Sequence, residues 1–99
     1  MKITGIKTYV LQAMLDDKGF GWSQRVTDKR QTAISVITTD EGIEGYGEAF
    51  YFGGPAKIVA GMIDDALGPL IVGKNPLDTS VIWDILYNWT RDQGMKGIT

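Results

Sequence analysis

The sequence lacks cysteine and histidine, and these two absences exclude several kinds of chemistry. Without cysteine there is no disulfide framework, thiolate nucleophile, iron–sulfur cluster or zinc–thiolate site. Without histidine, the most frequent general base and the most frequent zinc ligand are missing as well. We therefore expect a cytoplasmic protein with no redox function.

Charge of one sign and long apolar runs are also scarce. Ten basic and twelve acidic residues leave a net charge of −2, whereas a general nucleic-acid binder presents a strongly basic face. No apolar stretch approaches the roughly 20 residues that cross a bilayer, and Met1–Lys2 leads into a mixed segment rather than a signal peptide's apolar core. Neither a nucleic-acid nor a membrane partner is expected.

The length of 99 residues corresponds to one small domain. Such a chain buries about two-thirds of its unfolded surface, which is enough for a modest core but not for a deep, enclosed active site. The protein is therefore either a simple binding or structural module or one part of a larger molecule.

The first half of the chain has the patterns of extended structure. Three strands are predicted, at Lys2–Met14, Gln31–Thr39 and Ile43–Phe50, and the turn before the third has Gly42 at a position suited to a positive φ. The short turn between the second and third runs predicts an antiparallel hairpin, which Lys2–Met14 can join to give a three-stranded meander. The glycines of GIEGYG then lie in a hairpin strand, where a phosphate-binding loop is not expected.

The second half changes to helical periodicity. Pro55 is suited to open a helix, whose apolar stripe is predicted to end at Gly68-Pro69 before a short apolar return, Leu70–Gly73. A second helix is expected after Asn75, capped by Asp78 or Thr79. The residues expected to form the first stripe are Ile58, Val59, Met62, Ile63, Ala66 and Leu67, and those expected to face inward from the second helix are Ile82, Ile85, Leu86 and Trp89.

Strands followed by helices predict an α+β fold, with the helix pair packed on one face of the sheet. Alternation along the first strand predicts Ile6, Thr8 and Val10 on one side. The opposite sheet face is expected to be too apolar for solvent, so that something else covers it. Its members are expected among Tyr9, Leu11, Ala33, Ser35 and Ile37.

The acidic residues suggest a metal site, but their positions favour a solvated surface for most of them. Asp40, Glu41 and Glu44 are expected on a solvated turn and strand edge, and Asp64 and Asp65 on the outer face of the first helix. Glu48 is the exception. We expect it to be partly buried and to make a structural hydrogen bond.

The segment Asp16–Arg30 is the strongest functional candidate. Its 15 residues exceed an ordinary connection and combine basic side chains with Phe20 and Trp22. A flap of this kind can close over a small anion, because the Arg25 guanidinium matches a carboxylate. The alternative is that an aromatic ring anchors the loop while its charges face water, and spacing alone favours that alternative. A second candidate edge is Phe50–Gly54, since adjacent aromatics cannot all be buried on one side.

The ordered set of segments resembles one family. The opening strand MKITGIKTYV, the strands around TTDEGIEGYGEAF, and LGPLIVGKNPLD with WDILYNW are similar to the N-terminal capping domain of the mandelate racemase/muconate lactonizing enzyme group, in the enolase superfamily. The similarity covers essentially all 99 residues. The most specific stretch is Thr38–Ala49.

The resemblance implies a larger protein. In that family the capping domain precedes a (β/α) barrel, which would hold the acid/base residues and Mg²⁺. The implied chemistry is proton abstraction α to a carboxylate. By resemblance we expect residues 1–99 to be the specificity cap of a homo-oligomeric acid-sugar dehydratase, with a racemase/epimerase or cycloisomerase as the alternative. A free-standing module that binds a small acid or a protein remains a further alternative.

The resemblance also implies which residues touch substrate. The capping domain contributes two loops over the barrel mouth, which correspond to Asp16–Arg30 and Phe50–Gly54 here. No residue of this chain is expected to be catalytic or to bind the metal. The expected substrate-binding residues are Phe20, Trp22, Arg25, Tyr51 and Phe52.

Overall fold

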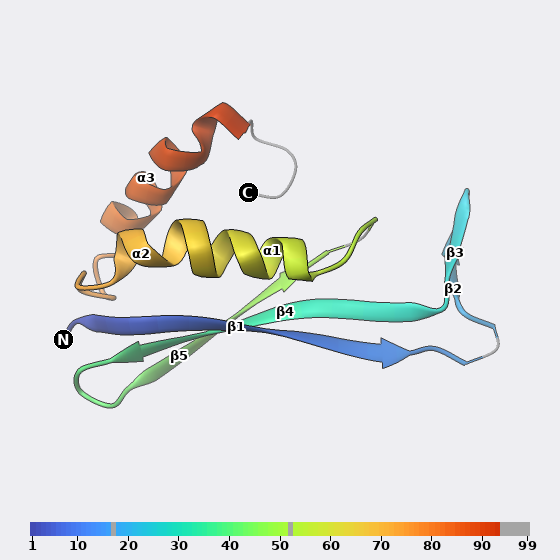
Figure 1. The fold of residues 1–99 in the computed structure, drawn as a ribbon, viewed down its shortest axis with the longest axis horizontal. Helices are drawn as coiled ribbons and strands as arrows, with labels where there is room; N and C mark the ends of the chain where they lie inside the picture. The colour runs from blue at the N-terminus through green and yellow to red at the C-terminus, as the bar shows by residue number, and fades with distance from the viewer. Residues whose placement is uncertain (17, 52, 94–99) are drawn as a thin grey trace.

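The computed structural model describes residues 1–16, 18–51 and 53–93 and shows a sheet with helices on one face (Figure 1). The strands are β1 (Ile3–Met14), β2 (Phe20–Trp22), β3 (Arg25–Thr27), β4 (Lys29–Thr39) and β5 (Glu44–Phe50). The helical elements are α1 (Lys57–Gly61), the π-helical η1 (Met62–Leu67), α2 (Gly68–Ile71), α3 (Thr79–Thr90) and the 3₁₀ turn η2 (Arg91–Gln93).

The main sheet is the predicted antiparallel meander, in the order β1-β4-β5. Its turn has Gly42 at φ 76°, a conformation that glycine adopts without strain. Thr8 pairs with Ser35, which pairs with Gly47, so these three residues share the face beneath the helices. The α+β fold with helices on one face is therefore confirmed.

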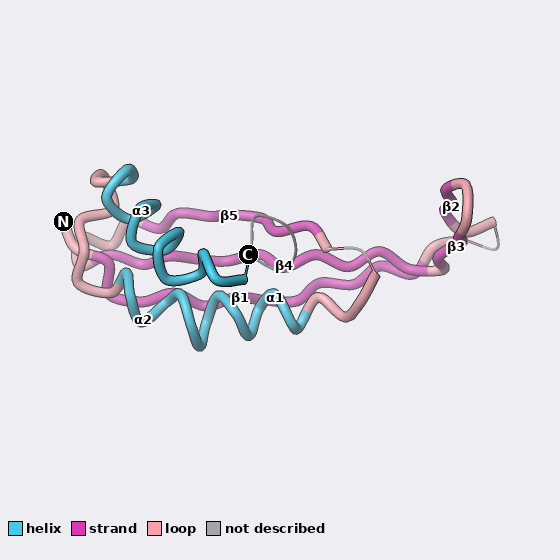
Figure 2. Tube along the Cα trace, turned by 90° about the horizontal axis from the view of Figure 1, so that it is seen from above, coloured by secondary structure: helices cyan, strands magenta, loops and turns pink. Residues whose placement is uncertain are grey.

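The helical layer runs along β1 (Figures 1 and 2), and the core beneath it is small. Its buried apolar residues come from both layers: Ile3, Ala33, Ala56, Val59, Ala60 and Ile71. Within the described ranges, no helix combines the length and the apolar character needed to cross a membrane.

The prediction that Gly68-Pro69 ends the first helix is wrong. Helical structure continues to Ile71, because the Gly68 N–H bonds five residues back to the Ile63 carbonyl and Pro69 falls in the first turn of α2, where its missing N–H costs nothing. Leu70–Ile71 is consequently helical rather than extended. The true end has Gly73 at φ 85°.

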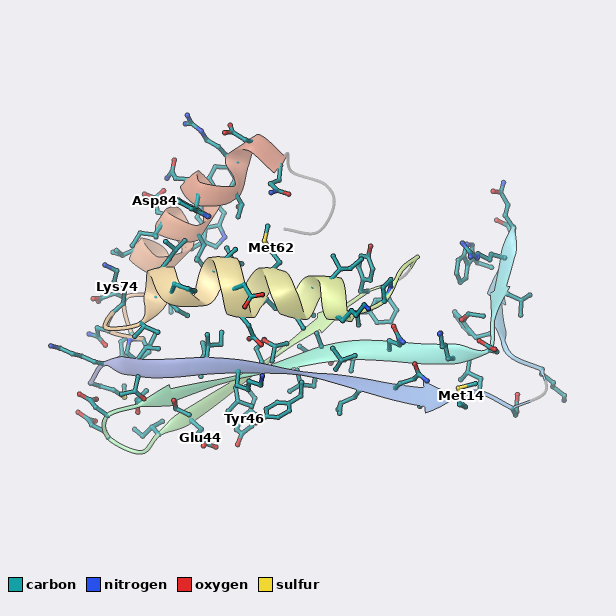
Figure 3. All side chains as sticks on the ribbon, in the orientation of Figure 1. Met14, Glu44, Tyr46, Met62, Lys74 and Asp84 are labelled. Atoms are coloured by element: carbon teal, nitrogen blue, oxygen red, sulfur yellow. The ribbon has the colours of Figure 1, made fainter. Side chains whose placement is uncertain are left out.

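The same π-helical turn changes which side chains face the sheet. Its wider spacing rotates the residues relative to an α-helix, and the predicted stripe holds only in part. Val59 is buried, whereas Ile58 is 41% exposed and Met62 points away from the sheet (Figure 3). Asp64, predicted on the outer face, instead accepts a hydrogen bond from the Thr8 N–H at 3.2 Å. It thereby caps a donor on the free edge of β1.

The helix α3 begins at Thr79 after Asp78, as predicted, but no side-chain hydrogen bond caps it. Trp89, predicted to face inward, is 65% exposed. The reason is that α3 diverges from α2 and from the sheet, so its last turn, which carries Trp89, lies away from the sheet (Figure 1).

The composition of the far sheet face is partly corrected. Tyr9 and Leu11 lie there, 52% and 54% exposed. Ala33, Ser35 and Ile37 pair with Val10, Thr8 and Ile6 and so face the helices.

Candidate functional site

The segment expected as a long irregular loop contains a two-stranded ribbon, β2–β3, and β4 starts earlier than predicted, at Lys29. Trp22 pairs with Arg25 across the ribbon. Gly19, at φ 61°, permits the bend before β2, and a Cβ there would lie 2.8 Å from the Thr27 carbonyl oxygen. The ribbon stands at one end of the sheet on the same side as the helices (Figure 1).

Hydrogen bonds hold the base of the ribbon at the start of β4 and just beyond the end of β1. The Thr27 hydroxyl donates to the Lys29 carbonyl at 2.9 Å and accepts from the Lys29 N–H at 3.4 Å. The Leu15 N–H donates to the Asp28 carbonyl at 2.7 Å. The ribbon therefore leaves the sheet in a defined direction.

A cavity of about 400 Å³ lies between the ribbon and the segment that follows β5. The ribbon side is lined by Trp22, Arg25, Val26, Thr27, Asp28 and Lys29, and the other side by Gln31, Phe50, Tyr51, Gly53, Gly54 and Pro55. Two predicted binding segments, whose nearest ends Arg30 and Phe50 are twenty positions apart in the chain, thus meet at one cavity.

Glycine shapes the second wall. A Cβ on Gly54 would lie 3.0 Å from Cε1 of Tyr51 and 3.1 Å from its hydroxyl, so the absence of a side chain lets the Tyr51 ring lie against the backbone. Gln31 ties this wall to the sheet. Its Oε1 accepts from the Ala56 N–H at 3.0 Å, and its Nε2 donates to Gln12 Oε1 at 2.6 Å.

The structure brings together three of the five expected substrate-binding residues, Trp22, Arg25 and Tyr51. Phe20 does not line the cavity. The Arg30 guanidinium lies over its ring, 4.6 Å from the centroid, in a cation–π arrangement. Phe52 lies outside the described residues.

Sequence reasoning did not select Asp28, Lys29 and Gln31 as site residues, although they line the cavity. Lys29 was visible only as one of several basic residues. Gln31 carries no distinguishing signal, because its position at the cavity follows from the register that places it opposite Gln12.

The cavity chemistry suits binding of a small polar anion. Arg25 and Lys29 supply cationic donors, and Trp22 and Tyr51 supply ring faces against which a sugar or lactone ring can lie. Asp28 supplies an acceptor for hydroxyl groups.

Acidic residues elsewhere do not converge. Among the residues that the structure describes, no three histidine, cysteine, aspartate or glutamate side chains are grouped to bind a metal. Glu48 is exposed rather than partly buried, and it makes the expected structural hydrogen bond by accepting from the Thr32 hydroxyl at 2.7 Å.

Comparisons with known proteins match most or all of this chain to one family. The family model described as mandelate racemase/muconate lactonizing enzyme, N-terminal domain, matches residues 6–95. D-galactarolactone cycloisomerase of Agrobacterium fabrum (strain C58) is 38% identical over 99 residues, which is 100% of this chain and 25% of that protein. A D-galactonate dehydratase family member of Marinomonas sp. (strain MWYL1) is 38% identical over 73 residues, covering 71% and 17%.

A solved structure is also similar to nearly the whole chain. The 3,6-anhydro-D-galactonate cycloisomerase of Zobellia galactanivorans superposes with a TM-score of 0.78 at 31% identity, over 99% of this chain and 24% of that one. The present chain therefore spans about a quarter or less of the length of these relatives. It belongs to the mandelate racemase/muconate lactonizing enzyme family, in the enolase superfamily, and has the fold of that family's N-terminal domain.

Proposed function

We propose that residues 1–99 form the specificity cap of a longer enzyme in which a C-terminal (β/α) barrel follows. The single observation that carries this proposal is the cavity in which the ribbon residues Trp22 and Arg25 meet Tyr51 of the second segment. It matches the resemblance's expectation that two loops jointly cover the barrel mouth. Closure of such loops excludes water and holds the distal part of the substrate.

The proposed substrate is a sugar acid or its lactone. Arg25 and Lys29 would bind carboxylate or hydroxyl oxygens, and the rings of Trp22 and Tyr51 would lie against the carbon skeleton. The names of the compared relatives also refer to galactose-derived acids and lactones. The role of this chain is thus to bind and orient the substrate and to exclude water from it.

The proposed chemistry belongs to the barrel. By family resemblance, Mg²⁺ held there would stabilise the enolate formed when a proton α to the carboxylate is removed. The described residues of this chain do not fit a magnesium site, because their carboxylates are not grouped. We therefore assign them no metal ligand and no proton transfer. A cytoplasmic location is part of the same proposal and rests on the absence of cysteine.

The reaction that we propose first is cycloisomerisation, because two of the compared proteins that match essentially all of this chain are cycloisomerases. Dehydration, the reaction expected from the sequence, is the second candidate. It is supported by the relative from the D-galactonate dehydratase family, which matches 71% of the chain. Both reactions begin with the same proton abstraction, which is why a cap alone does not distinguish them.

The test is product analysis with the full-length protein. The protein is incubated with Mg²⁺ and a panel containing D-galactarolactone, D-galactonate and 3,6-anhydro-D-galactonate, and products are identified by ¹H NMR with and without a metal chelator. We expect chelator-sensitive conversion of at least one compound, and the product's structure assigns cycloisomerisation or dehydration. Conversion of dipeptides or aromatic hydroxy acids, with no turnover of the sugar acids, would contradict the proposed substrate class.

A further inference from the structure

The sheet face opposite the helices carries a patch of exposed apolar side chains. We define this outer face by four of them, and their exposed fractions are 52% for Tyr9, 54% for Leu11, 70% for Tyr46 and 60% for Phe50. Figure 3 shows Tyr46 and Glu44 projecting from this side of the sheet, away from the helices. A contiguous apolar patch with charged residues around it marks an interaction surface on a soluble protein.

The patch has charges of opposite sign on its two edges. Lys7 lies on the edge strand β1, in the same row as Val36 and Tyr46, while Glu44 and Glu48 lie two residues to either side of Tyr46 on the edge strand β5. The strand β4 separates the two edge strands by about 10 Å, and Lys7 makes no ion pair with either glutamate among the described residues. In the described part of the chain the ion pairs are Met1–Glu41 and Arg91–Asp92, so these three charges have no counter-ion there.

The outer face also points away from the other candidate interface. The ribbon β2–β3 and α3 both lie on the helix side of the sheet (Figure 1). A barrel covered by the ribbon, as proposed above, would therefore also lie on the helix side. The outer face then needs a different occupant.

We propose that the occupant is a second copy of this chain, and that the two outer faces pack together around a two-fold axis running along β4. Such an axis places β1 of one copy over β5 of its partner. Lys7 then lies above the row of the partner's Tyr46, between the partner's Glu44 and the partner's Glu48, and the symmetry makes the same contacts twice. Tyr9, Leu11, Tyr46 and Phe50 are buried between the sheets.

The charges distinguish this arrangement from the other simple two-fold packing. An axis perpendicular to the strands would place β1 over β1 and β5 over β5, so the basic edge would lie over the partner's basic edge and the acidic edge over the partner's acidic edge. Like charges that face each other in an interface are costly. The axis along β4 instead places each Lys7 opposite two glutamates of the partner. The carboxylates are also held in place, because Glu44 accepts from the Tyr46 hydroxyl at 2.6 Å and Glu48 accepts from Thr32 at 2.7 Å.

The test is the molar mass of the full-length protein, measured by light scattering after size exclusion. We expect an even-numbered assembly for the natural sequence and a twofold lower mass for Lys7→Glu, which places three negative charges together. Glu44→Lys/Glu48→Lys is expected to lower the mass in the same way. The triple variant Lys7→Glu/Glu44→Lys/Glu48→Lys restores the complementary pattern and is expected to recover the original mass.

The matched control is Lys57→Glu, an equal charge change at an exposed residue of α1 on the helix side. It is expected to leave the mass unchanged. A monomeric natural protein overturns the proposal, as does an assembly whose mass Lys7→Glu does not alter. Loss of mass in Lys7→Glu without recovery in the triple variant also overturns it, since that result shows that the proposed charge pairing does not hold the assembly together. None of these outcomes depends on the enzyme's reaction.

Discussion

Single residues position the walls of the cavity. The Tyr51 ring lies against Gly54 because that residue has no Cβ. Gln31 fixes the start of the helical layer by accepting from the Ala56 N–H, and the Thr27 hydroxyl brackets the backbone of Lys29. The side chains proposed to touch substrate thus depend on neighbours that do not touch it. Substitutions at those neighbours are expected to affect binding indirectly.

Tyr46 gives a residue-level prediction about pH. The hydrogen bond that its phenol donates to Glu44 raises the pKa of Tyr46, and the negative charge of Glu44 and slight burial raise it further. A phenolate cannot donate, so this bond is present below the ordinary tyrosine pKa and is lost as pH rises through the raised value.

We expect Glu44→Gln to lower the Tyr46 pKa toward the ordinary tyrosine value. The measurement is an NMR titration of the ¹³Cζ resonance in labelled tyrosine. Glu48→Gln is the matched control, because Glu48 accepts from Thr32 rather than from a tyrosine. Equal Tyr46 titration curves for Glu44→Gln and the natural protein would contradict the assigned cause.

At the scale of elements, the contact between helix and sheet depends on Gly68. A Cβ at this position would lie 2.5 Å from Cγ2 of Ile6 and 3.1 Å from the Ile63 carbonyl oxygen. Neither neighbour is the free end of a flexible side chain, so the helix must move away from β1. We expect Gly68→Ala to lower the free energy of unfolding by about 1–3 kcal/mol, as overpacking does.

The measurement for Gly68→Ala is chemical denaturation of the full-length protein. Gly47→Ala is the control, since a Cβ there meets no described atom within 4 Å. A Gly68→Ala protein as stable as the natural one, or one no less stable than Gly47→Ala, would contradict the close packing of α2 on β1.

The ribbon gives a second element-level prediction. Arg30 on β4 lies over the ring of Phe20 on β2, and an exposed cation–π contact contributes about 0.5–1 kcal/mol. Phe20→Leu is therefore expected to open the ribbon more often and to speed trypsin cleavage after Arg25 and Lys29 by about two- to fivefold. Phe20→Tyr keeps a ring and should cleave at the natural rate. Equal cleavage rates for the leucine and tyrosine variants would contradict the claim that this contact restrains the ribbon.

The strands were predictable from the sequence because β-branched runs and a turn glycine give a local signal. Gln31–Thr39 and Ile43–Phe50 were close to the observed β4 and β5. The helical half was less predictable. The end at Pro69 and the outward position of Asp64 were inferred from α-helical periodicity, and a π-helical turn depends on tertiary packing rather than on local pattern.

The candidate site was predictable only as two segments. Trp22, Arg25 and Tyr51 could be chosen by residue type. Phe20 was chosen on the same grounds, but its ring contacts the Arg30 guanidinium instead of lining the cavity. That distinction depends on the ribbon's register, which pairs Phe20 with Thr27 and Trp22 with Arg25. The short, glycine-containing strands that set this register carry almost no periodic signal.

At the scale of the whole molecule, the two sides of the sheet carry different surfaces. The helix side carries the cavity and the ribbon, and the outer face carries the apolar patch with complementary charges. In the proposed full-length enzyme the first side meets the barrel and the substrate, while the second meets another copy. A substitution on one side is therefore expected to leave the function of the other intact.

The central claim is that the cavity of this chain binds the substrate of the full-length enzyme. The most direct measurement is kcat and KM for Arg25→Ala with the best sugar acid or lactone, beside Arg91→Ala, an exposed cation outside the cavity. We predict that Arg25→Ala lowers kcat/KM by the equivalent of about 1–3 kcal/mol, mainly through KM and without a change in Mg²⁺ affinity, while Arg91→Ala has no effect. Unaltered kinetics of Arg25→Ala with every sugar acid tested would contradict the claim.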